Sequence, residues 1–243
     1  YSYLSKYYDI VNDSLDRDPI DVTDRSSLDQ TMFDTSPDYV INCAAATSVD
    51  KCESDREWAY DVNVNGIKNI IASTNINTKV IHISTDYVFD GKKESFNEKD
   101  IPNPLSYYGK VKLESENILR SCNREHLILR TSVIFGGHGN NFYTWVRDSL
   151  LKNKKISVVT DQISNPTWTW SFSEAIYKSI INNLDGIYHF AGEEVVSRYE
   201  FALKIAKINN LNCDNIIPIE TKELDQLAKR PSFSTLNTDK IRN

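Results

Sequence analysis

The fold is decided by the stretch Val80-Ile81-His82-Ile83-Ser84-Thr85-Asp86-Tyr87-Val88-Phe89-Asp90-Gly91. Its first four residues form an apolar run that predicts a buried strand, and hydroxyl-bearing side chains follow where that strand ends. Ligands of open α/β sheets bind at the carboxyl ends of the strands. We therefore expect an α/β sheet protein whose chemistry takes place near Thr85.

A second pattern lies in the helix predicted after the loop that contains Pro102 and Pro104. Tyr108 and Lys112 are four residues apart, so they lie one above the other on a helix face. A phenol has a pKa of about 10, and an ammonium one turn away favours its anion. We interpret Tyr108 as a proton donor whose pKa is lowered by Lys112 and whose hydroxyl network includes Thr85. A lone Tyr-x-x-x-Lys also occurs on solvent-exposed helix faces, so the strand-end threonine is what gives this pattern weight.

Composition sets the outer limits of the function. The chain has 243 residues, 40% of them apolar and 26% charged, which suits one large domain or a domain with a smaller lobe. A net charge of -6 argues against nucleic acid as a partner, because that would require a basic face. No apolar run approaches the roughly 20 residues of a membrane span, and no signal-peptide pattern is present.

The cysteines and histidines indicate neither disulfides nor a metal site. The four cysteines form no CxxC pair, and the four histidines show no metal-ligand spacing. We therefore expect reduced thiols in a cytoplasmic protein without a metal. His82 and His189 lie within predicted strands and are interpreted as core residues or as residues that support the site.

Three blocks of sequence together resemble the extended short-chain dehydrogenase/reductases, and among them the dTDP-4-dehydrorhamnose reductases. The blocks are Ser84–Gly91, Tyr108-Gly109-x-x-Lys112 and Leu129-Arg130-Thr131-Ser132. The resemblance covers nearly the whole chain and implies a Rossmann-type parallel sheet flanked by helices, with a smaller C-terminal substrate-binding lobe. Residues 1–150 would form the NAD(P)-binding core and residues 151–243 mainly the substrate lobe. The boundary is soft because the two parts are interwoven.

The resemblance also implies an activity and a set of site residues. The activity is reduction of the 4-keto group of dTDP-4-dehydro-6-deoxy-L-mannose to dTDP-L-rhamnose, with NADPH or NADH as cofactor. The implied catalytic residues are Tyr108, Lys112 and Thr85. The implied cofactor-binding residues are Asp21, Val22, Ala44, Ala45, Ala46, Asn63, Tyr108 and Lys112, with Asn63 ordering Lys112 through a water. The implied substrate-binding residues are Thr85, Asp86, Tyr87, Val49 and Asn141.

The chain departs from the family pattern in two places. Tyr8–Val11 is interpreted as the second Rossmann strand, so the first strand and its glycine-rich turn are expected upstream of Tyr1. Asn12 and Asp13 then offer a ribose acceptor without an arginine clamp, and NADH and NADPH both stay open. Val133 stands where many of these reductases have a tryptophan that contacts the sugar, which leaves the exact sugar and nucleotide base open.

Two other functions stay open. One is a reductase or epimerase that acts on another nucleotide sugar. The other is a non-catalytic regulatory subunit, like the β subunit of methionine adenosyltransferase, which resembles this family. The intact set of Thr85, Tyr108 and Lys112 favours an enzyme. The expected partner is a nucleotide-sugar substrate, with a homodimer as a further possibility.

The remaining pattern predicts helices and their caps. A helix is expected from Ser26 to about Thr35. Two capping boxes, in which a serine and a glutamate three residues later satisfy each other's backbone, are expected at Ser54-x-x-Glu57 and Ser197-x-x-Glu200.

Overall fold

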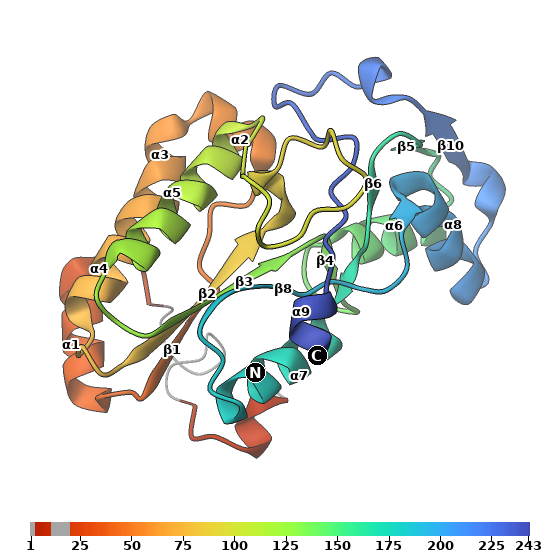
Figure 1. Cartoon of the computed structure of the whole chain (residues 1–243). Helices are drawn as coiled ribbons and strands as arrows, with labels where there is room; N and C mark the ends of the chain where they lie inside the picture. Colours follow the sequence, from red (N-terminus) through yellow and green to blue (C-terminus); the bar gives the residue numbers. More distant parts are fainter. Residues whose placement is uncertain (1–2, 11–19) are drawn as a thin grey trace.

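A parallel sheet forms the centre of the protein (Figure 1). The computed structural model describes residues 3–10 and 20–243, and the four strands of this sheet run in the order β1-β2-β3-β8. Their bounds are β1 (Tyr39–Asn42), β2 (Lys79–Thr85), β3 (His126–Thr131) and β8 (Gly186–His189). All neighbouring pairs are parallel, so the carboxyl ends of the strands share one edge.

Helices cover both faces of the sheet (Figure 1). One face carries α1 (Arg25–Thr35), α4 (Gly66–Ser73) and α5 (Tyr107–Ser121), and the other carries α7 (Thr169–Ile181). Alternate strand residues point to opposite faces: Val80 and Ile128 pack with the first group, whereas Ile81 and Leu127 pack with α7. Burial of both faces is typical of a parallel sheet. The predicted Rossmann-type α/β fold is confirmed.

The side of β2 that faces α5 changes from apolar to polar along the strand. Val80 lies in an apolar cluster, His82 contacts Ser115 of α5, and Ser84 donates a hydrogen bond to Glu116 of α5. These three strand residues alternate, as a period of two requires. Polar groups therefore lie between β2 and α5, close to the carboxyl end of the strand, where α/β proteins bind ligands.

A broken helix lies beside α5. Its pieces are α2 (Val49–Ser54), α3 (Arg56–Tyr60) and the π-helical turn η2 (Asp61–Asn65), which runs on into α4. The predicted Ser54-x-x-Glu57 capping box is wrong. Asp55 caps α3 by accepting the Trp58 N–H at 3.1 Å, because Ser54 is the last residue of α2 and its hydroxyl donates back to the Lys51 carbonyl at 3.2 Å.

The second lobe has a core of its own. It contains α6 (Phe142–Leu151), α8 (Arg198–Ile208) and the parallel pair β5 (Ile156–Val159) and β10 (Ile216–Ile219). The predicted capping box of Ser197 and Glu200 is found at the start of α8. The apolar cluster of this lobe includes Val146, Leu150, Val158, Phe201, Ile205 and Ile216. Because the chain returns from the lobe to form α7 and β8, the two parts are interwoven, and a boundary near residue 150 stays a prediction.

Short elements complete the chain. They are η1 (Leu4–Lys6), η3 (Asp86–Val88), β4 (Ile134–Phe135), β6 (Ile163–Ser164), β7 (Thr167–Trp168), β9 (Val196–Ser197), η4 (Cys213–Asn215), η5 (Thr221–Glu223) and α9 (Asp239–Arg242). The predicted strand at Tyr8–Val11 is not formed over residues 8–10, and Val11 lies outside the described residues, as do Asn12 and Asp13. Within residues 3–10 and 20–243, no helix is long and apolar enough to cross a membrane.

Candidate active site

The strand-end threonine is held by a buried carboxylate. The Thr85 hydroxyl accepts the Tyr87 N–H at 3.2 Å and donates to Asp86 Oδ1 at 2.9 Å. The other oxygen of Asp86 accepts from the Ser132 hydroxyl at 2.7 Å. Burial raises the pKa of Asp86, and the hydroxyls of Ser234 and Ser132 oppose that rise. Three segments far apart in the sequence therefore fix the position of the Thr85 side chain.

Tyr108 lies beside Thr85 in the first turn of α5. The helix begins there because the Ser106 side chain caps it, accepting the Gly109 N–H at 3.2 Å. A Cβ on Gly109 would lie 2.2 Å from the Tyr87 carbonyl oxygen, so glycine is what lets α5 approach η3 this closely. Burial raises the pKa of the Tyr108 phenol, and the Thr85 hydroxyl lowers it. The phenol is therefore protonated and in contact with the strand end.

Lys112 lies one turn further along α5, and the residue is 2% exposed. Its Nζ donates to the Ile83 carbonyl at 2.7 Å and lies 3.2 Å from His82 Nε2. Burial lowers the pKa of Lys112 to about 8, against the opposing effect of the Glu116 carboxylate. The groups with the largest effects on the Tyr108 pKa do not include Lys112, so the predicted influence of this lysine on that phenol stays a prediction.

The predicted cofactor residues Ala44, Ala45, Ala46 and Asn63 come together where β1 ends. The Ala44 N–H donates to Asn42 Oδ1 at 3.1 Å, which fixes the start of the alanine block. Asn63 lies in the η2 turn and donates to the Ala59 carbonyl at 2.9 Å and the Ala46 carbonyl at 3.4 Å. Its Oδ1 is buried and has no hydrogen-bond partner among the described residues. π-helical turns often mark functional sites, and this one presents a free buried acceptor.

The predicted pair Asp21 and Val22 is anchored on α4. Asp21 is exposed and accepts from both the backbone and the hydroxyl of Thr23, at 2.8 and 2.7 Å. Val22 packs in the apolar cluster of α1, α4 and α5, which Ala44 also contacts. Asn69 of α4 donates to the Val22 carbonyl at 2.9 Å. The pair and the alanine block thus lie on the same side of the sheet.

Two predicted substrate residues link the core to the second lobe. Val49 begins α2, and its neighbour Asp50 forms an ion pair with Arg230 at 2.7 Å. Tyr87 is half-buried; loss of contact with water raises the pKa of its phenol, and the Arg198 guanidinium at the start of α8 opposes the rise. The residues around Thr85 are therefore bordered by both parts of the chain.

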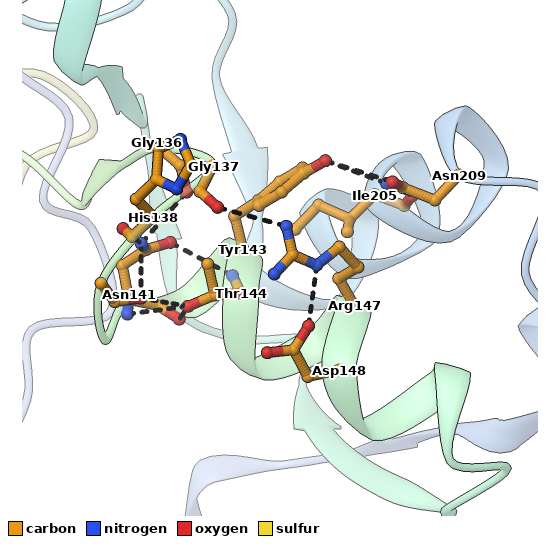
Figure 2. Close-up of polar contacts among 11 residues, drawn as sticks. Gly136, Gly137, His138, Asn141, Tyr143, Thr144, Arg147, Asp148, Ile205 and Asn209 are labelled. Atoms are coloured by element: carbon orange, nitrogen blue, oxygen red, sulfur yellow. Dashed lines mark hydrogen bonds and ion pairs between the residues drawn. The ribbon is translucent and has the colours of Figure 1, made fainter.

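Asn141 lies between the glycine loop and α6 (Figure 2). It caps α6: its Oδ1 accepts the Thr144 N–H at 3.2 Å, and its Nδ2 donates to the carbonyls of Gly136, His138 and Gly139 at 3.1, 2.9 and 3.3 Å. Within the described part of the chain, these hydrogen bonds all stay in its own loop and the first turn of α6. Asn141 therefore organises the glycine loop, and its contact with substrate stays a prediction.

Val133 has a strained backbone. Its φ of 42° lies in the left-handed region, which is unfavourable for a β-branched residue. The preceding residue, Ser132, is the partner of the Asp86 carboxylate, and the carbonyls of both Ser132 and Val133 accept from the Thr167 N–H at 3.0 and 3.2 Å. Strain of this kind tends to cluster at functional sites. It occurs here at the position where the resemblance expects a sugar contact.

Sequence reasoning missed the polar residues below Lys112. Ser115 and Glu116 follow it at the spacings that share a helix face, and both are fully buried. Glu116 pairs with Arg130 of β3 at 2.7 Å. The spacing of these residues, together with the polar residues of β2, could have predicted a buried polar contact between α5 and the sheet.

Residues 5–243 match the family model described as the RmlD substrate binding domain. The chain is also 40% identical to a dTDP-4-dehydrorhamnose reductase of Aggregatibacter actinomycetemcomitans, over 94% of this chain and 82% of that relative. The chain belongs to the dTDP-4-dehydrorhamnose reductase family. The predicted family and its oxidoreductase class are confirmed.

Solved structures agree with this family membership. A Bacillus anthracis dTDP-4-dehydrorhamnose reductase in complex with NADP superimposes with a TM-score of 0.89 at 32% identity, covering 99% of this chain and 87% of that one. A Thermus thermophilus UDP-glucose 4-epimerase in complex with NAD gives a TM-score of 0.76 at 18% identity, covering 92% and 76%. The epimerase likeness shows the shared fold alone.

Proposed function

We propose that the protein reduces the 4-keto group of dTDP-4-dehydro-6-deoxy-L-mannose to dTDP-L-rhamnose, with NADPH or NADH as its cofactor. One observation carries the proposal: a hydroxyl at the end of β2, a protonated, half-buried phenol beside it and a buried amine one helical turn away. The activity named for the Aggregatibacter relative and the NADP bound to the Bacillus anthracis relative support it.

The residues at the end of β1 fit a nicotinamide cofactor. Asn63 Oδ1 is a buried acceptor without a partner among the described residues, and the alanine block allows close approach to the backbone. The amine of Lys112 donates one hydrogen bond to the Ile83 carbonyl and has further hydrogens for ribose hydroxyls. A bound reduced nicotinamide would supply the hydride.

The chain's own residues would then complete the reduction. As negative charge develops on the sugar oxygen, Tyr108 gives that oxygen its phenolic proton. The Thr85 hydroxyl, which donates to Asp86 in this structure, would turn to donate to the same oxygen. Lys112 would hold positive charge near the resulting phenolate and lower its energy.

The substrate would be held between the two parts of the chain. Asp86, Tyr87 and Val49 would contact it from the core, and Asn141 from the glycine loop of α6. In this scheme residues 151–243 serve mainly as the substrate lobe. A homodimer and a cytoplasmic location belong to the same proposal.

The test is turnover of dTDP-4-keto-6-deoxy-L-mannose with NADPH and with NADH, followed by identification of the sugar product. Formation of dTDP-L-rhamnose with either cofactor is expected. Reduction or epimerisation of a different nucleotide sugar in its place would favour the first rival. Absence of turnover together with stable binding to a methionine adenosyltransferase would favour the regulatory subunit.

A further inference from the structure

A chain of buried polar groups ends at the side chain of Lys112. It runs from Asn42 at the end of β1 to His82 in the middle of β2 and Ser115 on α5, all of them under 10% exposed. His82 Nδ1 lies 3.1 Å from Asn42 Nδ2, and its Nε2 lies 3.1 Å from the Ser115 hydroxyl and 3.2 Å from Lys112 Nζ. Three elements of the fold therefore meet at one imidazole.

The contacts of Asn42 and of Ser115 each determine which nitrogen of the His82 ring carries the hydrogen. The Ala44 N–H can only donate, so the Asn42 atom 3.1 Å from it is the oxygen, and the Asn42 amide group donates to His82 Nδ1. The Lys112 carbonyl can only accept, so Ser115 uses its one hydrogen there, at 2.6 Å, and accepts from His82 Nε2. The two arguments are independent, and each assigns the hydrogen of neutral His82 to Nε2.

With its hydrogen on Nε2 and donated to Ser115, His82 cannot accept a hydrogen bond from Lys112 at this nitrogen. An ammonium at Lys112 would direct an N–H at a nitrogen that cannot accept it, across the 3.2 Å contact with Nε2. A neutral amine has one hydrogen fewer to place and can still donate to the Ile83 carbonyl at 2.7 Å. We propose that His82 is a positioning residue that lowers the proton affinity of Lys112, because its tautomer is locked with the hydrogen on Nε2 and this nitrogen then has no lone pair to accept an N–H from Nζ. The inference rests on the proposed function only where it concerns the use of Lys112 in the reaction.

Other charges near Lys112 act in the opposite direction or are neutralised. Glu116, on the same helix, and the Cys43 thiol, after β1, both raise the Lys112 pKa, and Glu116 is itself paired with Arg130 of β3. Burial and Lys112 lower the pKa of His82, which keeps its ring neutral. With a pKa of about 8, Lys112 can gain and lose a proton near neutral pH.

The first test uses the unmodified chain. Long-range ¹H–¹⁵N correlation spectra show which ring nitrogen of a histidine carries hydrogen, and the chain has four histidines to assign. The His82→Gln spectrum identifies the signal of His82. We expect a neutral ring with its hydrogen on Nε2 from neutral to alkaline pH. A hydrogen on Nδ1, or on both nitrogens at neutral pH, would overturn the proposal.

The second test reverses the tautomer. In Asn42→Asp the carboxylate can only accept, from both Ala44 and His82, so the imidazole hydrogen moves to Nδ1 and Nε2 becomes an acceptor for Lys112. The Lys112 pKa, read from its ¹³Cε resonance, should rise by about one unit or more, a tenfold gain in proton affinity. The new carboxylate also raises this pKa through its charge, so Asn42→Asp is repeated in a His82→Phe background. The rise must be larger when His82 is present, and equal rises in the two backgrounds would contradict the proposal.

Both measurements read the resting protein without substrate, which separates this inference from the proposed function. If the substrate is not turned over but the Lys112 pKa follows the His82 tautomer, the function fails and the coupling stands. If turnover depends on Lys112 but its pKa does not change with the His82 tautomer, only the proposed coupling between His82 and Lys112 is wrong.

Discussion

Helix α5 carries two buried charged residues one turn apart, and their surroundings are opposite. The Glu116 carboxylate receives the Arg130 guanidinium on both oxygens, Nε to Oε1 at 3.0 Å and Nη2 to Oε2 at 2.7 Å, together with the Ser84 hydroxyl. Among the described residues, Lys112 Nζ donates to one acceptor, the Ile83 carbonyl, and lies 3.2 Å from His82 Nε2. The paired charge of Glu116 joins the helix to the sheet, whereas the charge of Lys112 is buried without a carboxylate partner among the described residues.

The paired charge is also tied into the rest of the sheet. Arg130 Nη1 lies 3.4 Å from His189 Nε2 of β8, and its guanidinium lies 5.2 Å from the centre of the Phe89 ring. Burial and this arginine lower the pKa of His189 to about 3, so the histidine is neutral at any ordinary pH.

The largest expected effect comes from breaking the paired charge. Arg130→Met leaves the Glu116 carboxylate buried without a partner and should reduce the free energy of unfolding by about 3–5 kcal/mol. Urea denaturation measures this loss. The double variant Arg130→Met with Glu116→Met removes both charges and should recover most of the stability. If the free energy of unfolding of Arg130→Met stayed within about 1 kcal/mol of the parent, the ion pair would not contribute to the stability of the fold.

Tyr108→Phe tests the reactive side of α5. Removing the phenolic hydroxyl should lower kcat by roughly 10²-fold or more while cofactor binding and stability stay close to the parent. Tyr107→Phe is the matched control, since this neighbouring ring contacts the surface residue Arg56 and has no place in the proposed mechanism. Near-parental turnover of Tyr108→Phe would remove this residue from the mechanism.

Lys112→Met should have the opposite effect on stability to Arg130→Met. Burial makes the folded chain hold the Lys112 proton less tightly than the unfolded chain, so the cost is present below about pH 8 and is relieved as pH rises toward 10.5. The variant should therefore be more stable than the parent at neutral pH, by about 1–2 kcal/mol, and this gain should shrink in alkali. Turnover and cofactor binding should both fall. Lys110→Met, at an exposed position, is the control. If the stability difference between Lys112→Met and the parent did not change with pH, the idea that the Lys112 charge is buried at a cost would be wrong.

The smallest effect is expected at Val133, whose backbone is strained. Val133→Asn should stabilise the protein by about 1 kcal/mol, because asparagine tolerates the left-handed region. The chain already places Asn153, Asn183 and Asn210 at positive φ. Val133→Ala, which does not relieve the strain, serves as the comparison in thermal unfolding. Equal or lower stability of the asparagine variant would mean that the valine side-chain packing outweighs the strain.

The sequence predicted strand β2 and helix α5 because their signals are local. The apolar run at Val80 and the helical spacing of Tyr108 and Lys112 each lie within a few residues, and both are where they were expected. The family resemblance extended these local patterns to the fold as a whole. The capping box at Ser54 failed because a second candidate, Asp55, stood next to it and the preceding helix ended at the serine.

What the sequence did not predict depends on contacts between distant segments. The pairing of Glu116 with Arg130 and the role of His82 between Asn42 and Ser115 join residues from different strands and a helix. No periodicity within one element specifies such partners. The positive φ of Val133 was equally hidden, since valine gives no local signal for that conformation.

The wide turn at Asp61–Asn65 has a consequence for how this helix tolerates length changes. A π-helical turn contains one residue more than the α-helical turn it replaces. The helices on either side of it still present the same faces to their neighbours. Deleting one residue there should let α3 run straight into α4, with both still packed as before, yet Asn63 would leave its place beside the alanine block. Relatives that differ by a single residue across this turn should therefore share the fold and differ in the group presented to the Ala46 carbonyl.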